Sequence, residues 1–182
     1  MKQIAFVTST ESPEIAEDDQ ILLSAMEGYG IRGIAAPWDD PSVAWSNFDL
    51  VLIRSCWNYH LHPVRFQTWI NNIAPNVKVA NPPELVLWNL NKHYLKELAA
   101  EGILIPESVW IQEQDFSPDK LNHILSERKW DRAVVKPCVS ASSFRTSVIT
   151  SQNARQHGDE LSKSFPVGGI IVQKFVDAIP LH

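Results

Sequence analysis

The 182-residue chain contains only two cysteines, no long apolar run and no block of basic residues. Cys56 and Cys138 lie far apart in the sequence, which argues against both a disulfide framework and the close cysteine spacing of a zinc site. No segment approaches the roughly 18 consecutive apolar residues that a membrane span needs. The net charge of −5 comes without the stripe of lysine and arginine that nucleic-acid-binding proteins usually carry. The sequence therefore predicts neither a membrane nor a nucleic acid as a partner.

The N-terminal residues, MKQIAFVTSTESPE, also lack the features of two common kinds of segment. Their apolar stretch is too short for a signal peptide and is followed at once by acidic residues, so we expect a cytoplasmic protein. The G-x-G-x-x-G turn of Rossmann-type dinucleotide-binding proteins is absent, because TSTESPE follows the first apolar run. Hydrophobic residues nevertheless make up 45% of the chain, which is enough for a folded core.

Strand and helix patterns alternate in the first part of the chain, as in a small α/β domain. Strands are expected at 3–8, 31–37, 49–55 and 78–80, and helices at 18–28 and 63–73. The segment DLVLIRS has a continuous apolar centre, which is typical of a parallel strand buried on both faces. We therefore predict a doubly wound, Rossmann-like α/β domain over residues 1–83, which ends with the break Asn81-Pro82-Pro83.

The remaining residues, 84–182, are expected to form a separate α+β subdomain. The clearest pattern there is NLNKHYLKELAAE, which predicts a continuous helix over 89–101 with one apolar face, closed by Gly102. Further helices are expected at 117–128 and 153–164, and strands at 103–110, 133–136, 146–150 and 169–176. Because strands and helices no longer alternate regularly, no single sheet should span both halves of the chain.

The stretch RAVVKPCVSASSFRT has the composition of a phosphate-binding loop. A short apolar strand delivers Lys136, and Pro137 is expected to end that strand. Small hydroxyl residues follow it, namely Ser140, Ser142, Ser143 and Thr146. Their hydroxyl groups, the backbone N–H groups and the lysine could all point at oxyanions. The alternative is an edge strand with a solvated lysine, followed by an ordinary polar loop.

Three features of the second half occur in an order that resembles the ATP-grasp superfamily. They are an Asn-Lys step with Lys92 at the start of a helix, Val-Val-Lys-Pro with Lys136 at the end of a strand, and the later strand VQKFV, 172–176. More narrowly, four short motifs resemble a bacterial group similar to glutathione synthetase and to the cycloserine-biosynthesis ligase. They are RSCWNY (54–59), Asn81-Pro82, Trp88-Asn89 and Asn91-Lys92 with Leu95. The resemblance covers nearly the whole chain and corresponds to the N-terminal portion of such an enzyme.

The resemblance implies that ATP is the cofactor, and it assigns roles to individual residues. Lys92 and Lys136 would bind phosphate oxygens, and Gln173 would present its side-chain amide to the adenine amino group. The edge of adenine would be read by the backbone of the next residues, whose apolar flanks would sandwich the ring: Lys174, Phe175 and Val176. The structural alternative for Gln173 is an exposed strand residue.

Two further sets of residues are assigned roles, the lid by the same resemblance and Arg54 by its place after the third expected strand, since ligands of open α/β sheets bind at the carboxyl ends of the strands. The phosphate lid would be formed by Ser140, Ser142, Ser143 and Thr146. Lids of this superfamily are usually glycine-rich, whereas this one contains no glycine. Arg54 would act in catalysis by holding a substrate carboxylate or acyl phosphate through two parallel hydrogen bonds, and the alternative is a structural arginine that pins its loop. Asn58 stands where many relatives carry aspartate, so a different role is expected there.

The complete enzyme that the resemblance implies is an ATP-dependent carboxylate–amine or carboxylate–thiol ligase, which acts on a small carboxylate through an acyl phosphate. The magnesium ligands of such enzymes lie in a later catalytic domain that this chain lacks, so Mg²⁺ is expected but no metal ligand is predicted here. This chain alone should therefore not turn over ATP, and its open cleft should favour self-association. The alternative is a non-catalytic nucleotide-binding or assembly module with an incomplete ATP-grasp site.

Overall fold

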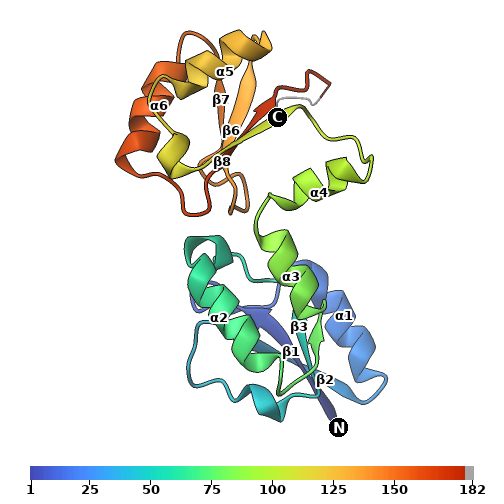
Figure 1. Ribbon diagram of the computed structural model, residues 1–182. Helices are drawn as coiled ribbons and strands as arrows, with labels where there is room; N and C mark the ends of the chain where they lie inside the picture. Colours follow the sequence, from blue (N-terminus) through green and yellow to red (C-terminus); the bar gives the residue numbers. More distant parts are fainter. Residues whose placement is uncertain (179–182) are drawn as a thin grey trace. The chain divides into compact units, whose positions relative to one another are not determined.

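The computed structural model describes residues 1–178 and divides the chain into two compact units (Figure 1). The first unit ends at Leu90 and the second begins at Asn91. This division falls after helix α3 (Pro83–Leu90), not before it at residue 83 as the sequence predicts. The reason is that Val86, Leu87 and Leu90 of α3 pack against the core of the first unit.

The first unit is built on a parallel sheet with strand order β2-β1-β3-β4. The strands are β1 (Lys2–Thr8), β2 (Ile31–Pro37), β3 (Leu50–Ile53) and β4 (Val79–Ala80), and the covering helices are α1 (Glu17–Glu27) and α2 (Pro63–Ile73). Short 3-10 turns lie at η1 (Trp45–Asn47) and η2 (Tyr59–Leu61). The order places β1 beside both β2 and β3, so the chain winds outward in two directions from its first strand, as the predicted doubly wound fold requires.

Each face of this sheet is covered by a helix (Figure 1). The face that carries Ala5 and Val7 packs against α2, where Phe66 and Ile70 are almost fully buried. On the other face, Leu23 of α1 lies so close to Gly33 of β2 that a Cβ at that glycine would be 2.1 Å from the leucine side chain. The apolar strands predicted from the sequence are thus buried from both sides, as expected for parallel strands in an α/β domain.

The second unit has an antiparallel sheet with strand order β5-β8-β6-β7. The strands are β5 (Ser108–Ile111), β6 (Ala133–Pro137), β7 (Ser147–Ile149) and β8 (Ile170–Lys174), and the helices are α4 (Tyr94–Ala100), α5 (Lys120–Arg128) and α6 (Ala154–Lys163). A 3-10 turn, η3, spans Glu113–Asp115. Helices α5 and α6 cover one face, where Leu121, Ile124 and Leu125 pack with Val135 and Val172. No strand joins the two sheets in the described residues, in agreement with the prediction of two separate sheets.

The continuous helix predicted over 89–101 is wrong, because α3 ends at Leu90 and α4 begins only at Tyr94. Two hydrogen bonds draw the intervening backbone away from a helix. The Lys92 N–H donates to the Cys138 carbonyl at 2.8 Å, and the Asn91 side chain accepts from the His93 N–H at 3.0 Å. Such local asparagine bonds compete with the helical ladder, and the tertiary bond from Lys92 removes a further donor from it.

Pro137 is the last residue of β6, so the strand ends one position later than the sequence predicts. It pairs with Ile170 of β8, and the next residue continues the pairing, since the Cys138 N–H donates to the Gly169 carbonyl at 2.9 Å. Strand β7 pairs with β6 only from Ala133 to Val135. The missing proline N–H therefore lies beside no partner strand, where its absence disturbs no ladder.

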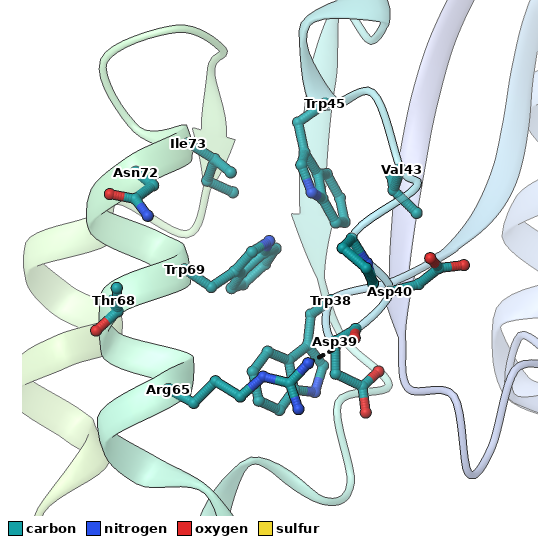
Figure 2. A pocket seen from close by; sticks show the side chains of 11 residues that line it. Trp38, Asp39, Asp40, Val43, Trp45, Arg65, Thr68, Trp69, Asn72 and Ile73 are labelled. Atoms are coloured by element: carbon teal, nitrogen blue, oxygen red, sulfur yellow. Dashed lines mark hydrogen bonds between the residues drawn. The ribbon is translucent and has the colours of Figure 1, made fainter.

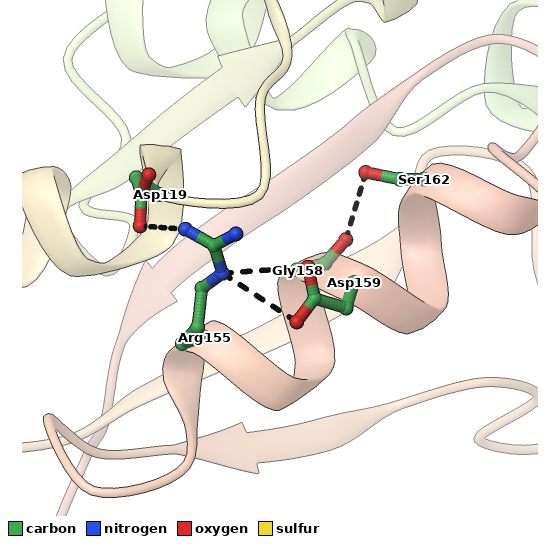
Figure 3. Close-up of polar contacts among 5 residues, drawn as sticks. All are labelled: Asp119, Arg155, Gly158, Asp159 and Ser162. Atoms are coloured by element: carbon green, nitrogen blue, oxygen red, sulfur yellow. Dashed lines mark hydrogen bonds and ion pairs between the residues drawn. The ribbon is translucent and has the colours of Figure 1, made fainter.

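Helix α6 makes a close approach to the start of α5 (Figure 3). Arg155 of α6 forms ion pairs with Asp119, just before α5, and with Asp159 one turn further along its own helix. Gly158 lies at the contact, and a Cβ built there would be only 2.1 Å from the Pro118 carbonyl oxygen.

None of the helices within residues 1–178 has the length and apolar character needed to cross a bilayer.

Candidate functional site

The strand register of the second unit places Lys136 and Gln173 on the same face of the sheet. Val134 lies directly opposite Gln173, and directly opposed residues in an antiparallel pair share a face. Lys136 is two residues beyond Val134, so its side chain returns to that face. Helices α5 and α6 pack on the other face, where the buried residues Ala133 and Val135 point. The predicted nucleotide site requires this arrangement, since its lysine and its adenine-facing amide must meet the same ligand.

Lys92 is held in place by the loop that follows β6. Its Nζ donates to the Ser140 carbonyl oxygen at 2.8 Å and to the Ser140 hydroxyl at 2.9 Å. Burial lowers the pKa of the Lys92 ammonium, and the nearby charge of Lys136 lowers it further. Burial also lowers the pKa of Lys136. Neither lysine forms an ion pair with a carboxylate in the part of the chain that the structure describes, so two half-buried positive charges lie close together.

Two residues of this cluster, Lys96 and Cys138, were not singled out by the sequence. Burial raises the pKa of the Cys138 thiol to about 11, against the opposing influence of the charges of Lys92, Lys96 and Lys136. The Nζ of Lys96 also lies 4.9 Å from the ring centroid of Trp110. The sequence signal for Lys96 is weak, because its spacing of four residues from Lys92 would put both side chains on one face only in a continuous helix, and α4 begins at Tyr94.

Gln173 is 7% exposed, which excludes the alternative of an exposed strand residue. Its Nε2 donates to the Ser108 hydroxyl at 2.9 Å, and that hydroxyl donates in turn to the Pro106 carbonyl at 2.6 Å. Because the Ser108 hydrogen is committed to Pro106, the hydroxyl oxygen must accept from Gln173, and this fixes the orientation of the amide. The carbonyl oxygen of Gln173 is thereby turned away from Ser108.

The backbone after Gln173 is less free than the resemblance implies. The Lys174 N–H donates to the Glu107 carbonyl at 2.8 Å, and the Phe175 N–H donates to the Arg132 carbonyl at 3.2 Å. Only the carbonyl groups of these residues, together with the backbone of the half-exposed Val176, are left for adenine. One face of the Phe175 ring is already covered, because the Arg132 guanidinium lies 4.1 Å from its centroid.

The predicted lid is a tight turn with an unusual backbone. Ser142, Ser143 and Arg145 adopt left-handed conformations, with φ of 47°, 58° and 50°. The turn is closed by hydrogen bonds from the Phe144 N–H to the Ala141 carbonyl at 2.8 Å and from the Thr146 N–H to the Ser143 carbonyl at 3.0 Å. A left-handed conformation costs a residue with a Cβ roughly 1–2 kcal/mol. The side chains of Ser142, Ser143 and Thr146 are exposed, whereas Ser140 is engaged with Lys92.

Arg54, in the first unit, is attached to a buried carboxylate. Its Nε donates to Asp19 Oδ1 at 2.6 Å, and the Ser55 hydroxyl donates to Asp19 Oδ2 at 3.3 Å. Asp19 is only 3% exposed, while the Arg54 side chain is 50% exposed. The structure thus shows the arginine pinning the loop after β3 to the first turn of α1. Half of its side chain remains accessible from solvent.

Asn58 bridges two side chains beside the same sheet edge. Its carbonyl oxygen accepts from the Trp38 indole N–H at 2.8 Å, and its amide donates to Asp39 Oδ2 at 3.2 Å. Burial raises the pKa of Asp39, but hydrogen bonds from Thr10 and Asn58 outweigh it, and the net pKa is lowered from the ordinary value of 3.8. This carboxylate therefore contributes stability above pH 3.8, and the contribution is lost as the pH falls below that value.

Replacing Asn58 with aspartate should reverse that pH dependence. The variant would place a second carboxylate where the amide now lies 3.2 Å from Asp39, and one of the two pKa values would rise above its unfolded value. The deficit should be about 1–2 kcal/mol at pH 7 and should shrink as the pH falls toward 4. Urea denaturation at several pH values measures this, with Asn47→Asp, an exposed site of the same unit, as the control. An equal loss of stability at pH 4 and pH 7 would contradict the expected rise in the pKa of one of the two carboxyl groups.

Residues 1–178 contain no group of three or more histidine, cysteine or acidic side chains that could hold a metal ion. No chemical step is assigned to a metal ion within these residues.

Comparison with known proteins gives the same partial alignment from sequence and from structure. Residues 4–81 match the family model described as "D-cycloserine synthetase DcsG, N-terminal domain". The cycloserine biosynthesis protein DcsG of Streptomyces lavendulae is 28% identical over 183 residues, which cover 98% of this chain and 60% of that protein. The crystal structure of D-cycloserine synthetase DcsG superposes with a TM-score of 0.88 at 26% identity, again over 97% of this chain and 60% of the other.

More distant structures share the fold. A RimK domain protein ATP-grasp from Sphaerobacter thermophilus superposes with a TM-score of 0.73 at 15% identity, over 97% of this chain and 65% of that chain. The carboxyaminoimidazole ribonucleotide synthase from Aspergillus clavatus, solved with ATP, superposes with a TM-score of 0.69 at 14% identity, over 97% of this chain and 47% of that chain. The predicted fold class is confirmed, and the chain spans about 60% of the length of its curated relative.

Proposed function

We propose that this chain, which resembles the N-terminal portion of ATP-grasp ligases over nearly all its length, binds ATP for an ATP-dependent carboxylate ligase. The observation that carries the proposal is the pair of half-buried lysines, Lys92 and Lys136, with no carboxylate to neutralise them in the described residues. Burial disfavours the charged form of both, as their lowered pKa values indicate. A polyphosphate placed between them would neutralise both charges and offset the free energy of their desolvation.

Each candidate residue has a defined part in this proposal. Lys92 and Lys136 bind phosphate oxygens and stabilise negative charge on the transferring phosphoryl group. Ser140 orients Lys92 through the two hydrogen bonds to its Nζ. Gln173 accepts a hydrogen bond from the adenine amino group through its carbonyl oxygen. Arg54 is the candidate for the substrate carboxylate, because half of its side chain is accessible while Asp19 fixes its Nε.

The reaction proposed for the complete protein joins a small carboxylate to an amine or a thiol. The carboxylate oxygen attacks the γ-phosphorus of ATP and displaces ADP, and the amine or thiol then attacks the acyl phosphate and displaces phosphate. Magnesium, when bound, would neutralise charge on the phosphates. The alternative of a nucleotide-binding module without catalysis makes the same use of the lysines, and ATP turnover distinguishes the two.

Nucleotide binding by the lysine pair can be tested by titration with a fluorescent ATP analogue at pH 7. Lys136→Ala should weaken binding by about tenfold or more, since it removes a charge-assisted contact to phosphate. Lys163→Ala, at an exposed position in the last turn of α6, is the matched control and should leave the affinity unchanged. Equal affinities for these two variants would refute the phosphate site.

An ATPase assay with Mg²⁺ on the same chain should show no turnover, and a rate of roughly one per second or faster would contradict the expected inactivity.

The fixed amide of Gln173 also predicts a preference for adenine over guanine. Its carbonyl oxygen would accept from the 6-amino group of adenine but would face the O6 of guanine, where two acceptors meet. ATP should therefore bind about tenfold more tightly than GTP, and Gln173→Leu should remove most of that difference. Competition of each nucleotide against the fluorescent analogue measures the ratio. A ratio that survives in Gln173→Leu would place base recognition elsewhere.

A further inference from the structure

The pairing of β6 with β8 continues one step beyond β8, to Arg132 and Phe175. Ala133 lies opposite Lys174, and the Phe175 N–H donates to the Arg132 carbonyl at 3.2 Å. Directly opposed residues of an antiparallel pair share a face, so the side chains of Arg132 and Phe175 lie beside each other. The Arg132 guanidinium is 4.1 Å from the Phe175 ring centroid and forms an ion pair with Asp177. Two contacts therefore hold this arginine at the end of the sheet.

Arg132 begins a row of three different side chains along β6. Val134 and Lys136 follow it at intervals of two residues, and side chains alternate along a strand, so all three lie on one face. Gln173 lies opposite Val134 and shares that face. Successive residues on one face of a strand are about 7 Å apart. A guanidinium, an apolar side chain and an ammonium group thus follow one another along the face opposite to α5 and α6.

The proposed phosphate site fixes which end of this row belongs to which part of ATP. Lys136 is near the C-terminal end of β6, and the loop with Ser140 follows it. Arg132 lies at the other end, about 13 Å from Lys136 along the strand. Gln173, the residue expected at the adenine amino group, lies between these ends. A nucleotide that reaches both Lys136 and Gln173 therefore directs its base, and not its phosphates, toward Arg132.

Arg65 of the first unit also lies over an aromatic ring, and the comparison shows what is different at Arg132 (Figure 2). The Arg65 guanidinium is 5.6 Å from the Trp38 ring centroid and donates to the Asp39 backbone carbonyl at 2.7 Å. That contact covers a buried ring and connects α2 with the segment after β2. In the second unit, by contrast, the ring of Phe175 is only partly buried and the Arg132 side chain is 42% exposed.

We propose that Arg132 contacts the base of the bound nucleotide, with its guanidinium stacked between Phe175 and adenine. This inference rests on the proposed function, because it requires ATP to lie along β6. A guanidinium is planar and stacks on aromatic faces, so the ring, the arginine and the base would form one column. Phe175 is then a positioning residue, which acts on adenine through Arg132 instead of covering the base itself.

Adenosine and inorganic tripolyphosphate separate the two ends of the site, because each represents one part of ATP. In about 0.15 M salt, which screens distant charges, Arg132→Met should weaken ATP and adenosine equally, by about three- to tenfold, and leave tripolyphosphate unchanged. Lys136→Ala should weaken ATP and tripolyphosphate but not adenosine. Arg65→Met is the matched control, since it removes the same kind of contact from the first unit, and it should leave all three affinities unchanged. Competition against the fluorescent ATP analogue measures each affinity.

Further variants test the stacking itself. Arg132→Lys keeps the charge without the planar group, so it should lose as much adenosine affinity as Arg132→Met. Phe175→Leu should weaken adenosine and leave tripolyphosphate unchanged, which a general disturbance of the site would not do. Phe175→Tyr retains the ring and should bind adenosine as the unmodified chain does.

NMR of the unmodified chain, labelled with ¹⁵N-arginine, makes the test independent of how the variants fold. Adenosine should shift the Nε–H signal of Arg132, which is the signal missing from Arg132→Lys, and tripolyphosphate should not. No shift with adenosine at millimolar concentration, a shift with tripolyphosphate alone, or full adenosine affinity in Arg132→Met would each overturn the inference and leave the phosphate site standing. If Lys136→Ala also left the ATP affinity unchanged, the proposed function would fail as well.

Discussion

Replacing Gly158 with alanine should lower the free energy of unfolding of the second unit by about 3 kcal/mol. The added Cβ would lie 2.1 Å from the Pro118 carbonyl oxygen and within 2.9 Å of two further backbone atoms of that residue. These are atoms of the backbone, so they cannot move aside as a flexible side chain could. The usual gain of roughly 1 kcal/mol from alanine in a helix is smaller than this overlap, so the net effect is destabilising.

The close approach at Gly158 is also held by charge, which limits how far α6 can move to relieve the overlap. Arg155 connects the two helices through Asp119 (Figure 3). Gly28→Ala is the matched control, because a Cβ there would meet only the Ala25 carbonyl at 3.4 Å and the backbone is already α-helical. Guanidinium denaturation followed by circular dichroism measures both variants. If Gly158→Ala is as stable as the control, the contact between α5 and α6 is looser than the structure indicates.

Replacing Arg54 with methionine should destabilise the first unit by about 2 kcal/mol. The loss arises from Asp19, which is 3% exposed and, among residues 1–178, would keep only the Ser55 hydroxyl at 3.3 Å as a side-chain partner. The expected value lies below that for a fully buried pair because the Arg54 side chain is 50% exposed and water can reach the space that it leaves.

A double-mutant cycle with Asp19→Asn separates this structural part from any role in substrate binding. Arg54→Met should cost much less in the Asp19→Asn background, because no buried carboxylate is then left without its cation. Denaturation midpoints of the four chains give the coupling energy. A coupling near zero would mean that Arg54 does not pin its loop, and the role in binding a carboxylate would then be the better account of this residue.

The parts of the fold that followed from the sequence were those with a strong local pattern. The strand 31–37 and the helix 63–73 have the expected bounds. The helix was predictable because its buried residues, Phe66, Trp69, Ile70 and Ile73, repeat with the period of a helix. The segment 89–101 has an equally good apolar repeat, but Asn91 accepts a hydrogen bond from the His93 N–H and the Lys92 N–H donates to the Cys138 carbonyl, and both contacts compete with helical hydrogen bonds. That competition depends on a residue almost fifty positions away, and no local pattern reveals it.

The candidate site followed the same division between local and distant information. The order of Lys92, Lys136 and Gln173 along the chain was enough to select them. The sequence could not show that Gln173 is oriented by Ser108, since that contact spans 65 positions. Nor could it show that Asp19, which stands in an acidic run, is buried beneath Arg54.

The bond between Lys92 and Ser140 couples two parts of the second unit mechanically. The Lys92 ammonium group donates hydrogen bonds to two oxygen atoms of Ser140 in the loop after β6. That loop and the segment leading into α4 must therefore move together or break both hydrogen bonds. An anion that binds the Lys92 ammonium group and displaces it would therefore either move Ser140 with it or break both hydrogen bonds. In the second case the turn that begins at Ser140 would lose these contacts and become more mobile. A spectroscopic label on that turn should then report the occupancy of a lysine that it does not touch.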